Sequence, residues 1–145
     1  MIKDLYQEVI LDHSKRPRNF RTLEEANRSA EGYNPLCGDR CKIFLKEAGG
    51  VIDRLAFQGS GCAISTASAS LMTEVLKGKT IAEAEALSAK FHNLLTKDQA
   101  PPDGLGELAV FSSVRNYPVR VKCATLPWNT LRAALRGSGQ VVSGE

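Results

Sequence analysis

The chain has 145 residues, of which 43% are hydrophobic and 24% are charged, and its formal net charge is +3. This size and composition predict one soluble globular domain with a core large enough to fold alone. The weak positive charge argues against a nucleic-acid-binding protein, and no run of residues approaches the roughly 20 apolar residues of a membrane span. The N-terminus carries acids where a signal peptide would have an apolar run, so we expect a cytoplasmic protein.

The N-terminal segment predicts a helix over residues 3 to about 14, because apolar residues recur there at helical spacing, and Pro17 ends it. His13 lies on the apolar stripe, which favours a packed histidine over a metal ligand. Residues 13–21 include four lysine and arginine side chains, which indicate either a docking patch for an acidic partner or a solvated loop. Residues 22–33 lack clear periodicity and are interpreted as a loop that could hold a short turn of helix.

Alternating side chains predict two strands, over residues 42–46 and 51–57. The Gly49-Gly50 pair between them suits a tight connection, so we expect the two strands to form an antiparallel hairpin. The turn at residues 34–39 leads directly into this hairpin, which gives the turn a rigid base.

The rest of the chain predicts helices. Gly59-Ser60-Gly61-Cys62 precedes a helix that Gly78 closes, and Thr80 with Glu83 forms a capping box for the next helix. Pro118 suits the first turn of the last helix. The expected helices cover residues 63–77, 81–96, 105–114 and 118–136, and a flexible polar tail is expected over residues 137–145.

Four cysteines stand at positions 37, 41, 62 and 123. In a reducing cytoplasm they are metal ligands or reactive thiols more often than disulfides. They form no Cys-x-x-Cys pair, which argues against a zinc finger. Any metal site must therefore be gathered from distant segments by the fold.

The first candidate ligands lie in the turn Asn34-Pro35-Leu36-Cys37-Gly38-Asp39. In an extended chain, residues two apart point the same way, so Cys37 and Asp39 can face one point in space. Thiolate and carboxylate are both acceptable zinc ligands. The alternative for this stretch alone is a Pro-Gly turn with a small buried cysteine.

Two further cysteines have settings that suit a ligand. Cys62 stands at a helix N-terminus, where free N–H groups and the helix dipole favour the thiolate. Cys123 shares a helix face with Arg120 and follows Lys122, which makes its surroundings electropositive. These two thiolates, with the thiolate and carboxylate of the turn, would complete a tetrahedral zinc site.

Three motifs occur in order along the chain. They are Asn34-Pro35-Leu36-Cys37-Gly38-Asp39, Gly59-Ser60-Gly61-Cys62-Ala63-Ile64-Ser65 and Arg120-Val121-Lys122-Cys123-Ala124-Thr125-Leu126. Together they resemble the SufU branch of the IscU-like iron–sulfur cluster assembly proteins, over about residues 1–136, which would form a single domain. IscU-type scaffolds carry His directly before the third cysteine, where this chain has Lys122. The 60 residues between the second and third cysteines are also typical of the SufU branch.

The resemblance implies an α+β fold, a small antiparallel sheet with helices packed on one side. It implies a zinc-dependent sulfur carrier that accepts persulfide sulfur from a PLP-dependent cysteine desulfurase and passes it to downstream iron–sulfur assembly proteins. The implied zinc ligands are Cys37, Asp39, Cys62 and Cys123. Cys37 would accept the sulfur once a partner histidine replaces it on the metal, and Arg120 would help to orient the site or the incoming cysteine of the partner.

Two other functions stay open. One is a scaffold that assembles a nascent iron–sulfur cluster on the same cysteines and transfers it, and the other is a non-catalytic adaptor with a structural zinc. Cys41 lies outside the family motif and is interpreted as a packing residue, although it shares strand parity with Cys37 and Asp39 and could reach the site. Asn129 follows Trp128 where members of the family often have His, and we assign it no consequence.

Overall fold

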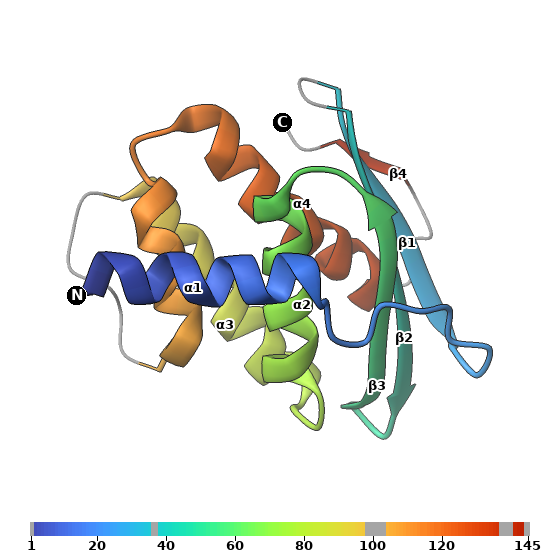
Figure 1. Ribbon diagram of the computed structural model, residues 1–145. Coiled ribbons are helices and arrows are strands. Elements are labelled where there is room, and N and C mark those ends of the chain that lie inside the picture. Colours follow the sequence, from blue (N-terminus) through green and yellow to red (C-terminus); the bar gives the residue numbers. More distant parts are fainter. Residues whose placement is uncertain (1, 36–37, 98–103, 137–140, 144–145) are drawn as a thin grey trace.

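The computed structural model describes residues 2–35, 38–97, 104–136 and 141–143 (Figure 1). In chain order the elements are α1 (Ile2–Lys15), β1 (Arg28–Asn34), β2 (Asp39–Ala48), β3 (Val51–Ser60), α2 (Ala63–Leu76), α3 (Ile81–Thr96), the 3-10 helix η1 (Gly106–Val114), α4 (Pro118–Leu135) and β4 (Val141–Ser143). Within these described ranges, none of the helices combines the length and the apolar character needed to cross a bilayer.

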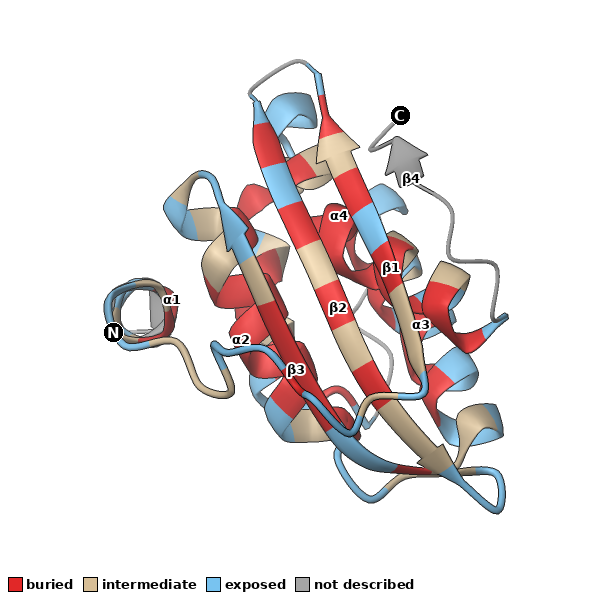
Figure 2. Cartoon of the chain, turned by 90° about the vertical axis from the view of Figure 1, so that its right-hand side faces the viewer, coloured by how far each residue is buried: buried red, intermediate tan, exposed pale blue. Residues whose placement is uncertain are grey.

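Four strands form one sheet in the order β3-β2-β1-β4. The pairs β1–β2 and β2–β3 are antiparallel, whereas the short β4 runs parallel to β1. The helices lie on one side of the sheet (Figure 1), and Figure 2 looks onto the opposite side, where the strands are in front. This arrangement confirms the predicted α+β fold with helices packed on one side of an antiparallel sheet.

Strand β2 shows why the sheet has this orientation. Cys41, Ile43 and Leu45 are buried, and the residues between them are at least partly exposed. Successive side chains of a strand point to opposite faces, so this alternation turns the apolar side of β2 toward the helices.

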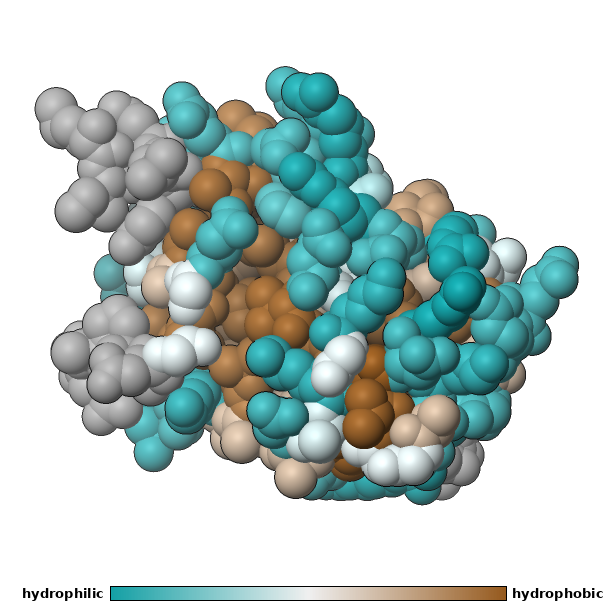
Figure 3. Space-filling view, turned by 90° about the horizontal axis from the view of Figure 1, so that it is seen from below, coloured by the Kyte–Doolittle hydropathy of each residue, from teal (hydrophilic) through white to brown (hydrophobic). Residues whose placement is uncertain are grey.

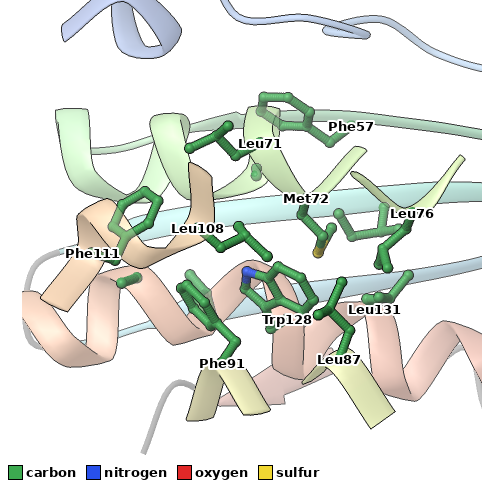
Figure 4. Packing of buried hydrophobic residues seen from close by; sticks show 14 of the residues in the cluster. Phe57, Leu71, Met72, Leu76, Leu87, Phe91, Leu108, Phe111, Trp128 and Leu131 are labelled. Atoms are coloured by element: carbon green, nitrogen blue, oxygen red, sulfur yellow. The ribbon is translucent and has the colours of Figure 1, made fainter. Parts of the chain in front are cut away.

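The core lies between the sheet and the helices and is built around Trp128 of α4 (Figure 4). The indole stacks on Phe91 with 4.8 Å between ring centroids, and Phe91 meets Phe111 edge-on at 5.6 Å. Trp128 Nε1 donates to Ser68 Oγ at 3.2 Å, and that hydroxyl donates to the carbonyl of Ala124 at 2.6 Å. The buried indole N–H is thus satisfied, and α2 is tied to α4.

Some apolar surface remains exposed. Leu11 and Phe20 are each nearly half exposed, and Tyr117 and Val119 at the start of α4 are just over half exposed. On the lower face, hydrophobic side chains gather at the centre and hydrophilic ones surround much of them (Figure 3). Apolar side chains therefore reach the surface on this face.

The structure corrects the expected loop over residues 22–33, because Arg28–Asn34 forms β1 and pairs with β2. The sequence of β1 has weak strand propensity, with a glycine at position 32. Gly32 instead allows a close approach to α4, since a Cβ at this position would collide with Thr130 Oγ1. Tertiary packing stabilises a strand that the local pattern does not indicate.

The other expected elements are present. The helix over 81–96 has the predicted ends, and the ends of the others are shifted. The hairpin is longer than predicted, because β2 begins at Asp39 and β3 continues to Ser60. The capping box at Thr80 is formed, and the expected helix over 105–114 is a 3-10 helix. The prediction of a flexible tail did not include β4, which lies within residues 137–145.

Candidate metal centre

Three of the predicted ligands converge at one end of the sheet. The carboxylate of Asp39 and the sulfurs of Cys62 and Cys123 each offer a ligand atom, and these three atoms all lie within 4.8 Å of one another. Asp39 is the first residue of β2, Cys62 directly precedes α2, and Cys123 lies in the second turn of α4. The fold thus brings together side chains that are far apart in the sequence.

Asp39 and Cys62 are joined by two hydrogen bonds. Oδ1 of Asp39 accepts from the backbone N–H of Cys62 at 2.9 Å, and Oδ2 accepts from the Cys62 thiol at 3.6 Å. Asp39 is only 1% exposed. One carboxylate oxygen therefore anchors the start of α2, while the other faces the sulfur.

Cys62 is the N-cap residue of α2. Its backbone is extended, with φ −76° and ψ 167°, and its sulfur accepts from the N–H of Ser65 at 3.5 Å. The N-terminal end of a helix carries a partial positive charge, which stabilises negative charge on a sulfur placed there. This confirms the predicted position of Cys62 at a helix N-terminus.

Gly61 makes room for the carboxylate. A Cβ at this position would collide with Asp39 Oδ1 and would lie 2.8 Å from Asp39 Cγ. Real Cβ atoms do not approach other heavy atoms so closely. The glycine before Cys62 is therefore a requirement of the site and not only of the turn.

Cys123 is 3% exposed, and its sulfur lies 4.0 Å from Nδ2 of Asn34. Asn34 belongs to the first motif, but no pattern around it indicates a role of its own. Its position opposite Asp39 in the β1–β2 register could have been found only by recognising β1.

Two further residues were predicted for the site, Cys37 and Arg120. Cys37 lies outside the described residues; of the turn around it, Gly38 has φ +72° and its N–H donates to the carbonyl of Asn34 at 2.8 Å. Arg120 is exposed, and its guanidinium lies over the ring of Tyr117, 4.9 Å from the centroid. Arg120 shares α4 with Cys123, one turn away.

Cys41 is a packed thiol in the structure. It is 4% exposed and belongs to the apolar core, and it is not one of the three clustered ligands. Burial raises the pKa of the Cys41 thiol to about 12, so the neutral form is strongly favoured. The geometry agrees with the interpretation of Cys41 as a packing residue.

His13 is also packed, as its place on the apolar stripe predicts. It is 6% exposed, and its Nδ1 lies 2.7 Å from Ser70 Oγ, which also accepts from the backbone N–H of Arg18. Burial lowers the pKa of His13, and the charge of Arg18 lowers it further. In the basic segment of residues 13–21, Arg16 and Arg18 both form salt bridges with Asp12. The nitrogen-to-oxygen distances are 3.6 Å and 2.7 Å.

The clustered side chains fit a zinc ion by their chemistry. Zinc binds thiolate sulfur and carboxylate oxygen, and it takes four ligands in structural sites. Asp39, Cys62 and Cys123 supply three donors of these kinds within a short distance. They are largely buried, and such a polar cluster is stabilised when a cation balances its charge.

Comparison with known proteins places this site in context. The model of the family described as "NifU-like N terminal domain" matches residues 5–124. The zinc-dependent sulfurtransferase SufU of Bacillus subtilis is 40% identical over 88% of this chain and 86% of its own length. The iron–sulfur cluster assembly scaffold protein IscU of Streptococcus pyogenes is 38% identical over 94% of this chain and 86% of its own.

A solved structure is similar to this chain in both sequence and fold. The putative iron–sulfur cluster assembly scaffold protein for the SUF system from Fervidobacterium islandicum AW-1 has a TM-score of 0.84 and 39% identity. The match covers 88% of this chain and 94% of that structure. Sequence and fold thus match the same group of proteins.

Proposed function

The chain belongs to the NifU-like N-terminal domain family of SufU- and IscU-type iron–sulfur cluster assembly proteins, and we propose that it acts there as a zinc-dependent sulfur carrier. Membership confirms the family predicted from the three sequence motifs. The proposed partners are a PLP-dependent cysteine desulfurase, which supplies the sulfur, and downstream assembly proteins, which receive it.

The observation that carries the proposal is the cluster of Asp39, Cys62 and Cys123. We propose that these residues hold zinc together with Cys37, which follows Asn34 in the turn that leads to Asp39. A bound zinc keeps coordinated cysteines in the thiolate form at neutral pH. The relative from Bacillus subtilis, named as a zinc-dependent sulfurtransferase, supports this choice of metal.

Cys37 is the proposed sulfur acceptor. Its thiolate attacks the outer sulfur of the persulfide on the desulfurase, a new S–S bond forms on Cys37, and the desulfurase cysteine leaves as a thiolate. The positions of the other ligands support this assignment. Cys62 caps α2 and Cys123 lies within α4, so both sulfurs are held by helices. Arg120, exposed one turn before Cys123, is proposed to orient the incoming partner.

A scaffold for a nascent iron–sulfur cluster is the second candidate. The relative from Streptococcus pyogenes, named as such a scaffold, favours it with nearly the same identity, and cysteine thiolates bind iron–sulfur clusters as well as zinc. The residue directly before Cys123 favours the carrier. The family resemblance implies that IscU-type scaffolds have His at this position. This chain has Lys122 there, which does not replace His as a metal ligand.

Metal content and absorbance of protein purified without air separate the two functions. A colourless protein with one zinc per chain supports the carrier, whereas a brown protein with iron and sulfide supports the scaffold. Adding a cysteine desulfurase and cysteine to the zinc protein then tests the transfer itself. Faster sulfide release in the presence of a reductant is expected from a carrier and not from an adaptor with a purely structural zinc.

A further inference from the structure

Asn34 is a polar residue at the end of a buried stripe. In β1, Ala30, Gly32 and Asn34 are all buried, and this is the side of the strand that packs against α4. Asn34 itself is fully buried. A buried amide is stable only when its donors and acceptors are paired, so its partners define what it does.

Asn34 is connected to the region of the metal centre by a side-chain contact, a backbone hydrogen bond and its position in the sheet. Its side-chain Nδ2 lies 4.0 Å from the sulfur of Cys123, within reach of an N–H to sulfur hydrogen bond. Its backbone carbonyl accepts from Gly38 at 2.8 Å, which closes the turn before β2. In the β1–β2 register it stands directly opposite Asp39.

The close packing of β1 on α4 brings the amide to the sulfur. A Cβ at Gly32 would collide with Thr130 Oγ1 and would lie 3.0 Å from Leu126 Cδ1, so the two elements meet without a side chain between them. Cys123 lies one helical turn before Leu126, and Asn34 lies two residues after Gly32 on the same face of β1. The two residues are therefore opposite each other.

We propose that Asn34 is a positioning residue for the metal centre, which donates its side-chain N–H to the Cys123 sulfur and holds it toward Asp39 and Cys62. This inference rests on the proposed metal site. An N–H donor stabilises the negative charge of a thiolate, and outer hydrogen bonds of this kind orient metal ligands. Through its backbone carbonyl, the same residue also accepts from the N–H of Gly38, which directly precedes β2.

The test compares Asn34→Asp with the parent chain. Aspartate has nearly the shape of asparagine and keeps the backbone carbonyl that closes the turn, but its carboxylate offers the sulfur no donor and brings a negative charge. We expect zinc affinity, measured by competition with a chromophoric chelator, to fall by roughly 10–100-fold. The thiolate-to-metal absorption of the cobalt-loaded chain should shift as well. The NMR measurement described below separates the loss of the donor from the effect of the added charge.

Asn27→Asp is the matched control. Asn27 also connects strands, because it donates to the carbonyl of Glu47 at 2.7 Å and accepts from its N–H at 2.8 Å, but it precedes β1 at the end away from the cluster. Its substitution should leave zinc affinity and the cobalt spectrum as in the parent.

The outcomes separate this inference from the proposed function. A parent chain that binds no zinc or cobalt refutes the metal site itself. A parent chain that binds, with an Asn34→Asp variant of equal affinity and unchanged spectrum, refutes only the role of Asn34. If the variant does not fold, NMR of the unaltered chain tests the role of Asn34 instead. The side-chain amide protons of Asn34 should shift on zinc addition while those of Asn27 do not, and an unmoved Asn34 signal overturns the proposal.

Discussion

Asp39 is hydrogen-bonded to the N-cap residue of α2, because its Oδ1 accepts from the backbone N–H of Cys62 at 2.9 Å and its Oδ2 accepts from the Cys62 thiol at 3.6 Å. One proposed ligand therefore fixes the position of another before any metal binds. Oδ2 of the carboxylate is directed at the cysteine sulfurs, where a cation would lie. The same contact links the fold of the protein to its proposed chemistry, and substitutions at Asp39 should affect both.

Replacing Asp39 with alanine is expected to weaken zinc binding or speed zinc exchange without unfolding the chain. Three proposed thiolate ligands remain, while the lost hydrogen bond to Cys62 should cost about 1–3 kcal/mol of unfolding free energy. Chelator competition and urea unfolding measure the two effects. Asp39→Asn is the control, since its amide oxygen can still accept from Cys62 but carries no charge. An alanine variant that binds zinc as tightly as the parent and stimulates the desulfurase equally would show that Asp39 is not an important ligand.

Gly61→Ala is expected to displace the Asp39 carboxylate. The added methyl group would collide with Oδ1, so either Asp39 or the start of α2 must move. Overpacking of this kind typically costs about 1–3 kcal/mol, and zinc affinity should fall with it. Ser60→Ala, at the exposed preceding residue, is the matched control and should leave both quantities unchanged. Equal zinc affinity and stability in Gly61→Ala would mean that the site tolerates a side chain there.

Local sequence patterns were sufficient for most of the fold. The apolar spacing of the helices, the capping box at Thr80 and the Gly49-Gly50 connection each depend on neighbouring residues, and each is present in the structure. Strand β1 was missed because its stability comes from pairing with β2 and from the contact of Gly32 with α4, which no local pattern contains.

The candidate site was predictable in part. The position of Cys62 before a helix follows from the pattern around it. The pairing of Cys37 with Asp39 was predicted from their spacing, and of the two the structure describes Asp39, which lies in the cluster. Cys123 was included because of its electropositive surroundings and the family resemblance, but its approach to Cys62 across 60 intervening residues depends on the packing of α2 against α4, which no local pattern contains. The role of Asn34 could not be predicted, because it depends on β1 being a strand and on the approach of β1 to α4.

The metal-free protein should lose stability as the pH falls below the ordinary histidine pKa of about 6.5. Burial lowers the pKa of His13 in the folded state, so the unfolded chain binds a proton more readily. Stability from this residue is present above the unfolded pKa and is lost as the pH falls. Urea unfolding in the presence of a chelator measures the free energy of unfolding at pH 7.5 and 5.5. The difference between the two pH values should be smaller in His13→Gln than in the parent. The same substitution at the exposed His92 should not change the effect, and equal pH effects in all three proteins would contradict the prediction.

Cys37 and Cys41 should behave differently in sulfur transfer. We expect Cys37→Ser to abolish stimulation of a cysteine desulfurase and Cys41→Ser to preserve it. Cys41 is 4% exposed, packs in the core and has a pKa raised by burial to about 12, so it offers neither access nor a thiolate at neutral pH. Cys37 directly precedes Gly38, whose φ of +72° suits a tight turn, and functional residues are more frequent in such connecting segments than in packed strands.

Sulfide release from a mixture of desulfurase, cysteine and a reductant measures the stimulation for each variant. Without reductant, mass spectrometry of tryptic peptides locates the persulfide, because cleavage after Arg40 places Cys37 and Cys41 on separate peptides. The added sulfur is expected on the Cys37 peptide alone. Sulfur on the Cys41 peptide, with normal turnover in Cys37→Ser, would require the buried thiol to become exposed during transfer. That result would overturn both the choice of acceptor and the packing role of Cys41.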